Sequence, residues 1–473
     1  MRTLTLAVML VLLTSCISMA PKRERPQLPG PDVWPQADSH APLQGWAEFF
    51  PDPALQILIR TALSNSRSLR QTVAAMEQAR AQWNITQANR LPHIELSAET
   101  ETTRRPADLR AGASGVDRSW SVATSITAFE LDFFGRVRNL HEAALEDYLA
   151  TEEAHRAAHI ALIAQIARTY LRLAANREEL ALTTDILHNR EATLRLTQSQ
   201  VEHGIATEQD LVLAEESVAA VQAEVARIHA QVAQDQNALA VLVGVPVHEL
   251  HLPAQRIEDV HMATRPAPGL PSDLLTRRPD ILAAEHQLWA AGARVGAARA
   301  ALFPKISLTS ALGLASTELT ALWSGAQRTW TVLPQMTLPI FDAGATAAGV
   351  AAAEAEQRLR LAQYEEAIQK AFQEVADALA SVESTHAQIQ AQIHRVASTA
   401  RLRELVAFRA ETGLESAFAV HDAERTFLEA SQSLLAARLG HKLAMIDLYA
   451  ALGGGWEETT TPSIPEPTSQ PGS

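Results

Sequence analysis

The chain has 473 residues, enough for two or three ordinary domains. It is 47% hydrophobic but only 5% aromatic, which favours long helices packed through small side chains over a globular core filled by rings. The net charge of -14, without a basic stripe in the sequence, argues against a nucleic-acid partner, because a phosphate backbone needs a basic surface.

The N-terminus has the pattern of an export signal. Arg2 precedes a mostly apolar run, Leu4 to Leu13, which is too short to span a bilayer and suits a signal peptide over residues 1–15. The run leads to Leu-Thr-Ser-Cys16, which resembles the bacterial lipobox. Cys16, the only cysteine, is therefore the predicted lipid attachment site. The next residue is Ile17, whereas an inner-membrane retention signal would have an aspartate there. An ordinary signal peptide with a chance cysteine is the alternative.

The segments on either side of the main body are polar and rich in proline. Residues 16–51 are expected to form a lipid-anchored extended segment, and residues 456–473, rich in Thr, Pro, Ser and Glu, a disordered tail. Between them, a helix is expected from Pro53 to about Asn89, where Pro92 stops it.

Four segments of about ten residues alternate between apolar and polar side chains. They are expected as strands at about 93–104, 118–130, 305–315 and 328–340. Their length is what a tilted strand needs to cross hydrocarbon, and the alternation fits a strand between lipid and a wet lumen. Trp120 and Trp330 would suit a headgroup girdle. A half-buried soluble sheet has the same period and stays open as an alternative.

Four strands cannot close a barrel. An open sheet edge in lipid leaves backbone groups without partners, so spanning strands would require an oligomer that pools them. Because about eight strands is the lower limit for barrels, at least two copies would be needed.

The second half of the chain repeats the first. Trp120-Ser-Val returns as Trp330-Thr-Val after 210 positions, and Gly204 returns as Gly413 after 209. A period near 200 is too long for a solenoid and indicates a two-fold internal repeat. The first structural repeat is placed at 52–250, a linker at 251–270 and the second repeat at 271–455.

Each repeat contains a very long helix. Residues 136–202 and 345–412 have no proline, and nearly seventy residues at 1.5 Å each would reach roughly 100 Å. In the segments that come after these two helices, beyond Gly204 and Gly413, small and apolar residues recur with heptad spacing, as in a coiled coil. Gly204 and Gly413 interrupt the pattern where a C-cap glycine lets the chain reverse, so each is expected at the tip of a long helical hairpin.

Several motifs together resemble the TolC-like outer membrane factor family, in its lipoprotein branch serving resistance-nodulation-division (RND) efflux systems (NodT-type outer membrane efflux lipoproteins). They are Gly269-Leu-Pro-Ser-Asp-Leu-Leu-Thr-Arg-Arg-Pro-Asp-Ile-Leu-Ala-Ala-Glu-His, Phe303-Pro-Lys-Ile-Ser-Leu, Phe129-Glu-Leu-Asp-Phe-Phe-Gly-Arg and Pro339-Ile-Phe-Asp-Ala-Gly. The resemblance covers roughly residues 45 to 455.

The resemblance implies a mixed α/β membrane protein. Its fold would be a homotrimeric outer-membrane β-barrel, with four strands per chain, continued by a long periplasmic α-helical coiled-coil barrel. It implies as partners a periplasmic adaptor (membrane fusion) protein, an inner-membrane RND-type pump and outer-membrane lipid.

The family closes its tunnel near the hairpin tips with acidic residues. Asp210, the sixth residue after Gly204, matches the first-half acid, and Asp422, the ninth after Gly413, matches one of two second-half acids. Ala419 replaces the other acid and Glu415 replaces an expected arginine. If Asp422 lines the constriction, three copies would favour cations; a solvated helix carboxylate is the equal alternative.

Other candidate chemistry has simpler interpretations. His155 and His159 lie four apart on a helix, but a third metal ligand is not evident, so a chance pair is favoured. Arg278 and Asp280 favour a local ion pair near a helix start over an anion site. No nucleophile elbow or phosphate loop occurs. We therefore expect no enzyme, no catalytic residues, no metal and no cofactor.

The sequence as a whole favours a passive outer-membrane exit duct of a tripartite efflux pump, carrying drugs or other small molecules from the pump to the exterior. A duct of a type I protein secretion system is one alternative. A pore-less periplasmic coiled-coil lipoprotein is another, from a different class, and a hydrolase is the weakest. The cargo is not identifiable from the sequence.

Overall fold

A computed structural model of the chain describes residues 18–23, 44–106, 115–250, 252–253, 256–263, 266, 274–324 and 327–459. Cys16 and the expected signal peptide lie outside the described residues. The chain forms two compact units, one of residues 1–27, 74–152 and 283–366, the other of residues 28–73, 153–282 and 367–473. Each unit takes segments from both halves of the sequence, because the two longest helices pass through both.

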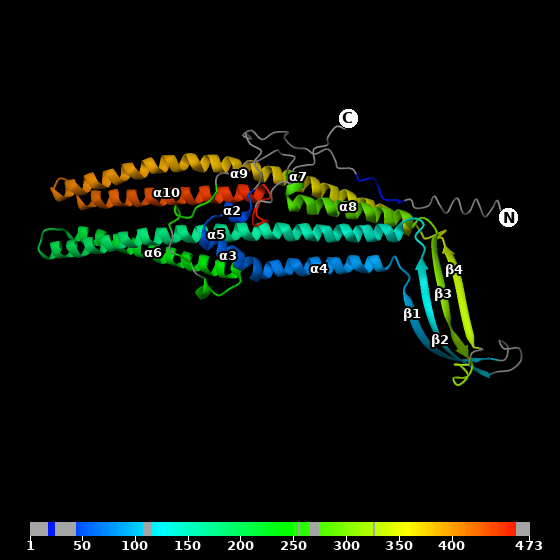
Figure 1. The fold of residues 1–473 in the computed structure, drawn as a ribbon. Helices are drawn as coiled ribbons and strands as arrows, with labels where there is room; N and C mark the ends of the chain where they lie inside the picture. Colours follow the sequence, from blue (N-terminus) through cyan, green and yellow to red (C-terminus); the bar gives the residue numbers. More distant parts are fainter. Residues whose placement is uncertain are drawn as a thin grey trace, which may run out of the picture. The chain divides into compact units, whose positions relative to one another are not determined.

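The first unit contains one antiparallel sheet with the strand order β1-β2-β3-β4 (Figure 1). The strands are β1 (Ile94–Arg105), β2 (Gly115–Glu130), β3 (Lys305–Ser316) and β4 (Arg328–Thr337). Ile94 lies opposite Ile126 in the first pair of strands, and Ile306 lies opposite Met336 in the last pair. The strands β1 and β4 form the two edges, so each has one side without a neighbouring strand in the described part of the chain.

The fourth strand is shorter than expected. It ends at Thr337, opposite Lys305, where its partner strand begins, whereas the sequence predicted an end near 340. Beyond that point the register would place Leu338 opposite Pro304 and Pro339 opposite Phe303, and neither proline has an amide hydrogen to donate to the ladder. The prediction was wrong there because alternation of side chains does not show where the partner strand stops.

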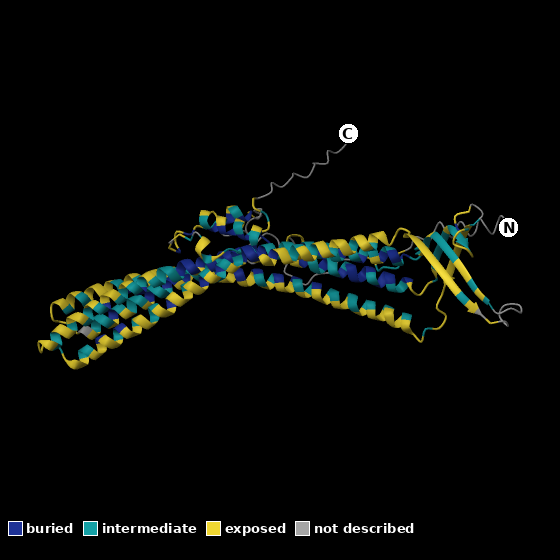
Figure 2. Ribbon diagram, turned by 90° about the horizontal axis from the view of Figure 1, so that it is seen from below, coloured by how far each residue is buried: buried dark blue, intermediate teal, exposed yellow. Residues whose placement is uncertain are grey.

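The apolar face of the sheet is not covered by the described chain. Ile94, Leu96, Trp330 and Met336 are exposed to 70%, 77%, 75% and 69%. Every residue of β4 is exposed (Figure 2). A half-buried soluble sheet would bury one of its faces, so the uncovered face disfavours that alternative.

Two aspartates connect the strands to the long helices. The side chain of Asp132 accepts a hydrogen bond from the Arg138 amide at 2.7 Å, at the start of α5 (Arg136–Glu202). Asp342 accepts from the Thr346 amide at 2.8 Å, at the start of α9 (Ala345–Glu411). A carboxylate there satisfies free amide groups and complements the positive end of the helix dipole.

The second unit contains two long helical hairpins. In one, α5 is followed by α6 (Glu208–Val243), and in the other α9 is followed by α10 (Ala417–Ala451) (Figure 1). Ala214, Val218 and Ile228 of α6 are buried, as the heptad spacing predicts. Further helices in the described part of the chain include α4 (Arg67–Ala88), α7 (Leu274–Arg277), α8 (Pro279–Ala300) and the short η2 (Val247–Glu249).

The core of the second unit lies where small elements pack on the long helices. It includes α2 (Trp46–Phe49) and α3 (Pro53–Asn65), and Phe49 stacks on Tyr449 of α10 at 4.0 Å between ring centroids. Residues 16–51 were expected to be extended, but this part of them is helical because Trp46 and Phe49 can be buried there. The helix expected over 53–89 is interrupted at Ser66, between α3 and α4.

Two segments expected as linker and tail also take part in this core. Ile257 and Val260, in the expected linker 251–270, are fully buried. In the expected tail, the carbonyl of Glu457 accepts a hydrogen bond from the Trp46 amide at 2.9 Å. Local composition did not predict these contacts, because they depend on distant parts of the chain.

Candidate functional site

The two hairpin tips have the same backbone geometry. Gly204 has φ +73° and Gly413 has φ +75°. The amide of Ile205 donates to the carbonyl of Gln200 at 2.8 Å, and the amide of Leu414 donates to that of Arg409 at the same distance. These are Schellman caps with glycine in the left-handed region. Nothing lies within 4 Å of a Cβ placed on either glycine, so backbone conformation alone requires them.

Asp210 is held in a capping box at the start of α6. One of its carboxylate oxygens accepts from the Thr207 amide at 2.9 Å and from the Thr207 hydroxyl at 2.7 Å. The Thr207 hydroxyl in turn accepts from the Asp210 amide at 3.2 Å. Hydrogen bonds from Thr207 lower the pKa of Asp210 below its usual value. This residue therefore has a local structural role besides the constriction role predicted from the sequence.

Asp422 has a different environment. It is exposed, and Arg425, one turn later on α10, donates to its carboxylate at 2.7 Å. Arg425 also donates to Glu429 at 2.6 Å. In α10 the N-cap is Ser416 and the capping-box position is Ala419, so the second tip has no box. Asp210 and Asp422 consequently occupy different turns of their helices.

Glu415, which departs from the family pattern, is also paired. The Arg409 side chain donates to its carboxylate at 3.1 Å across the tip. The tip therefore has an ion pair between the last turn of α9 and the connecting turn. At this tip the large apolar side chains of Leu414 and Phe418 are exposed, and at the first tip that of Ile205 is exposed.

A polar link between the hairpins was not predicted from the sequence. Arg190 of α5 is only 7% exposed and contacts the Nδ1 of His421 on α10. It also donates to the His421 carbonyl at 3.2 Å and lies 3.5 Å from the Glu424 carboxylate. The one signal in the sequence is that Arg190 follows the fully buried Thr183 by one heptad.

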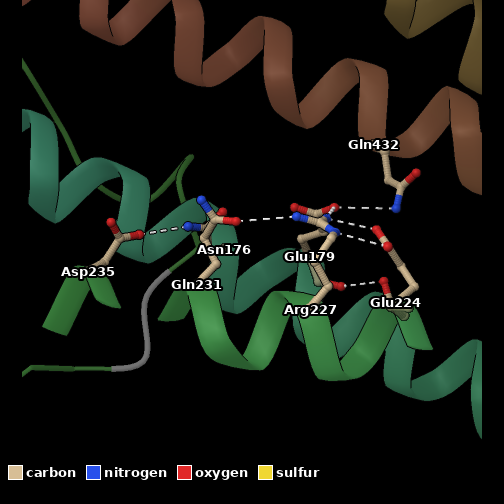
Figure 3. A network of polar contacts seen from close by, with 8 residues as sticks. Asn176, Glu179, Glu224, Arg227, Gln231, Asp235 and Gln432 are labelled. Carbon is tan, nitrogen blue, oxygen red and sulfur yellow. Dashed lines mark hydrogen bonds and ion pairs between the residues drawn. The ribbon is translucent and has the colours of Figure 1, made fainter. Parts of the chain in front are cut away.

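A second polar network joins α5, α6 and α10 (Figure 3). Glu179 of α5 lies 3.5 Å from Arg227 of α6 and accepts from Gln432 of α10 at 3.4 Å. Asn176 donates to the buried Asp235 at 2.7 Å. Burial raises the pKa values of Glu179 and Asp235. These groups hold three helices together through hydrogen bonds whose strength depends on protonation.

Among the described residues, no group of three His, Cys, Asp or Glu side chains could hold a metal ion. His155 donates to or accepts from the Thr72 hydroxyl at 2.8 Å, and its ring lies 6.0 Å from that of His159. Arg278 pairs with Asp280 at 2.6 Å and with Glu374 at 2.8 Å, so its charge is used within the fold.

Within the described part of the chain, no helix has both the length and the apolar character of a membrane span.

Comparison with known proteins identifies the family. A family model described as outer membrane efflux protein matches residues 58–245 and 270–454. The probable efflux pump outer membrane protein TtgC of Pseudomonas putida is 40% identical over 468 residues, which cover 97% of this chain and 96% of TtgC. The outer membrane protein OprJ of Pseudomonas aeruginosa is 40% identical over 460 residues, 96% of each chain.

Solved structures have the same fold. A membrane protein from Pseudomonas aeruginosa aligns with a TM-score of 0.89 and 40% identity, over 95% of this chain and all of that chain. The open state of the Neisseria gonorrhoeae MtrE outer membrane channel aligns with a TM-score of 0.86 and 34% identity, over 94% of this chain and all of that chain.

Proposed function

Because the chain belongs to the outer membrane efflux protein family, it is an outer-membrane channel of an efflux system, and we propose that three copies build one exit duct of a tripartite pump. In this proposal the four strands of each copy join one barrel, and the helical hairpins join one periplasmic tunnel. The duct is passive, and drugs or other small molecules reach it from an inner-membrane RND-type pump through a periplasmic adaptor.

The observation that carries the trimer is the uncovered sheet with two open edges. Its apolar face is exposed, and β1 and β4 each leave one row of backbone groups without a strand partner among the described residues. In lipid such edges must be paired, so the strands of several copies have to close on one another. A periplasmic spacer without a pore would have no use for such a sheet.

The internal repeat supports a specific pairing between copies. Pro92-His-Ile94 recurs as Pro304-Lys-Ile306, 212 positions later, and Trp120 recurs as Trp330 after 210. Ile94 of β1 is paired with Ile126 of β2. Adding 212 to the first number and 210 to the second gives Ile306 and Met336, which are paired in β3 and β4. In the pairing of β2 with β3, Val122 lies opposite Leu314. The same offsets relate Val122 to Val332 of β4 and Leu314 to Thr102 of β1, so Val332 is predicted to lie opposite Thr102 of a second copy.

Exposed side chains beside β4 fit the same arrangement. The connection from β2 to α5 is covered within the chain. The Leu131 amide donates to the Ile306 carbonyl at 2.8 Å, and Phe134 stacks on Phe303 with 4.8 Å between ring centroids. The corresponding connection in the second half, from β4 to α9, contains Ile340 and Phe341, whose side chains are 96% and 90% exposed. A second copy would cover them with the segment around Leu91, which is exposed as well.

A disulfide experiment tests the trimer. The variant carrying Val332→Cys and Thr102→Cys should give disulfide-linked dimers and trimers on a non-reducing gel. The matched control is Val332→Cys with Thr100→Cys, because a partner two residues away along the strand stands at about 7–8 Å and should link poorly. Equal linking of both pairs, or linking of neither, would contradict this register.

We also propose that Asp210 and Asp422 contribute to the narrow periplasmic end. Support comes from their place just beyond the tip glycines and from the exposure of Asp422. Asp422→Ala should reduce the cation selectivity of single channels in planar bilayers. The control is Glu429→Ala, which removes the other carboxylate bound by Arg425, about two helical turns beyond Asp422 and farther from the tip. Unchanged selectivity in Asp422→Ala would remove this residue from the constriction.

The remaining partners follow from the same proposal. Acylation of Cys16 would anchor the protein in outer-membrane lipid. The exposed Ile205, Leu414 and Phe418 at the tips offer an apolar surface to the adaptor. Co-purification of a candidate adaptor with the wild-type chain, and its loss with Leu414→Ser and Phe418→Ser, would support that contact. Recovery with a protein-secretion adaptor instead would favour the type I duct.

A further inference from the structure

A cavity of about 510 Å³ in the second unit (called the cleft here) lies where α10 ends, between α5 and α9 (Figure 1). One of its walls is the segment Arg278-Pro279-Asp280. Small-molecule sites in proteins occupy roughly 300–1,000 Å³, so the cleft is large enough for a ligand. The arginine-proline-aspartate segment therefore borders a cavity, besides forming its local ion pair.

The floor of the cleft is made of small apolar side chains. On α5 they recur every three or four residues, so one stripe of that helix faces the space. Alanine leaves open the volume that a larger side chain would fill, and an apolar group placed there would be removed from water. The floor residues are Ala157, Ile160, Ala161 and Ala164 of α5, Ala378 of α9 and Ala450 of α10.

The rim of the cleft is charged. It carries four carboxylates and two guanidinium groups, which leaves two negative charges. The charged residues are Asp280, Glu374, Asp377, Asp447, Arg168 and Arg278. An apolar floor below a negative rim matches a ligand with an apolar body and a positive charge.

The two guanidinium groups are engaged within the fold. Arg168 donates to Asp447 Oδ1 at 2.9 Å through Nε and at 2.5 Å through Nη2. The side chain of Arg278 is 8% exposed and pairs with Asp280 at 2.6 Å and with Glu374 at 2.8 Å. Because one guanidinium serves two carboxylates there, that group of three keeps a net negative charge.

Asp377 supplies the second negative charge. It is exposed, and its carboxylate accepts a hydrogen bond from the Gln373 side-chain amide at 3.3 Å. An amide is neutral and does not cancel the charge. A cation beside Asp377 would therefore gain its attraction while the ion pairs of Arg168 and Arg278 stay in place.

The cleft opens away from the apolar core of the second unit. Tyr449 of α10 stacks on Phe49 in that core. Asp447 lies two residues earlier, which turns it by about 200° around the helix. A ligand can thus reach the rim without disturbing the packing around Phe49.

A metal ion fits the cleft less well than an organic cation. Within the part of the chain that the structure describes, no group of three His, Cys, Asp or Glu side chains could hold a metal. The alanine floor also offers no oxygen or nitrogen ligand from its side chains.

We propose that the cleft is a binding site for amphipathic organic cations. The aromatic or alkyl body of the ligand covers the alanine floor, and its ammonium or phosphonium centre lies beside Asp377. The charge is held by Coulomb attraction and not by a directional pair, so the site accepts cations of different shapes. This inference goes beyond the exit duct and does not depend on conduction.

Equilibrium dialysis of the purified full-length protein in detergent tests the site, with tetraphenylphosphonium as the probe and protein-free micelles as the background. Triphenylphosphine oxide, which is neutral and has three of the same phenyl groups, should bind more weakly. Raising the salt from about 50 mM to about 500 mM should weaken binding of the phosphonium, because it screens the exposed carboxylates, and should not weaken binding of the oxide.

Matched variants locate the binding. Asp377→Asn keeps the shape of the side chain and should weaken phosphonium binding roughly two- to fivefold, the effect of one exposed charge, without changing binding of the oxide. Asp185→Asn makes the same charge change at an exposed position roughly 25 Å farther along α5 than Arg168 and should bind like wild type. Ala161→Phe, at an exposed floor position, should weaken binding of both ligands by filling the cleft.

Two results would overturn the site. One is equal phosphonium affinity in Asp377→Asn and wild type, and the other is phosphonium binding that salt and Ala161→Phe leave unchanged. Either result would leave the exit duct intact, because dialysis measures binding and not conduction. Conversely, a protein that binds the phosphonium as expected but never conducts in bilayers would keep the site and remove the duct.

Discussion

Arg190 joins the two hairpins of the second unit, and Arg190→Ala is expected to loosen α10 from α5. The side chain is 7% exposed and makes polar contacts with the His421 ring, the His421 carbonyl and Glu424. Losing charged hydrogen bonds at a buried site costs roughly 2–3 kcal/mol, even though the half-exposed Glu424 can be resolvated. Local opening of this part of α10 should then become roughly 30- to 150-fold more frequent.

The same contact predicts a dependence on pH. Since guanidinium can only donate, His421 must accept through Nδ1 and is therefore neutral. Burial, followed by the charge of Arg190, lowers the pKa of His421 below 6.5. The unfolded chain thus binds this proton more readily, so the link is complete above pH 6.5 and weakens as the pH falls through the lowered value.

Hydrogen exchange followed by mass spectrometry measures both effects. Peptides covering residues 417–430 should exchange faster in Arg190→Ala than in wild type at pH 7.5, and the difference should shrink as the pH is lowered below 6.5 through the lowered pKa of His421. Arg195→Ala, an exposed cation on the same helix, is the control and should match wild type. Equal protection in Arg190→Ala and wild type at pH 7.5 would refute the idea that this side chain holds the hairpins together.

Three further predictions concern local stability, each measured by thermal or urea unfolding of the purified protein. Gly413→Ala should cost about 1 kcal/mol because φ +75° is strained for alanine, whereas Gly349→Ala, in an open helix position, should stabilise by about the same amount. Thr207→Ala should cost about 1 kcal/mol through loss of the N-cap, and its effect should shrink as pH falls below 3.8, where Asp210 begins to be protonated. Tyr449→Phe should cost about 1 kcal/mol because the Gln44 carbonyl loses a 2.6 Å hydrogen bond.

The regular elements were predictable because their patterns are local and long. Alternation identified the four strands, and the absence of proline identified α5 and α9. Gly204 and Gly413 interrupt long heptad patterns, and both adopt the left-handed conformation that only glycine accepts without strain.

The contacts that organise the site were less predictable. Apart from its heptad spacing from Thr183, nothing in the sequence around Arg190 distinguishes it from an exposed arginine, because its partners lie more than two hundred residues away on α10. The burial of Trp46 and Ile257 depends on distant helices in the same way. Asp210 was predicted to have a family role, and the Thr207-x-x-Asp210 spacing also fits the capping box that the structure contains.

Electrical recording from planar bilayers tests the central claim most directly. The purified, acylated protein should insert as discrete conducting units whose single-channel conductance is uniform, because three copies close one water-filled pore. A well-folded, acylated preparation that binds the bilayer but never conducts would contradict the duct.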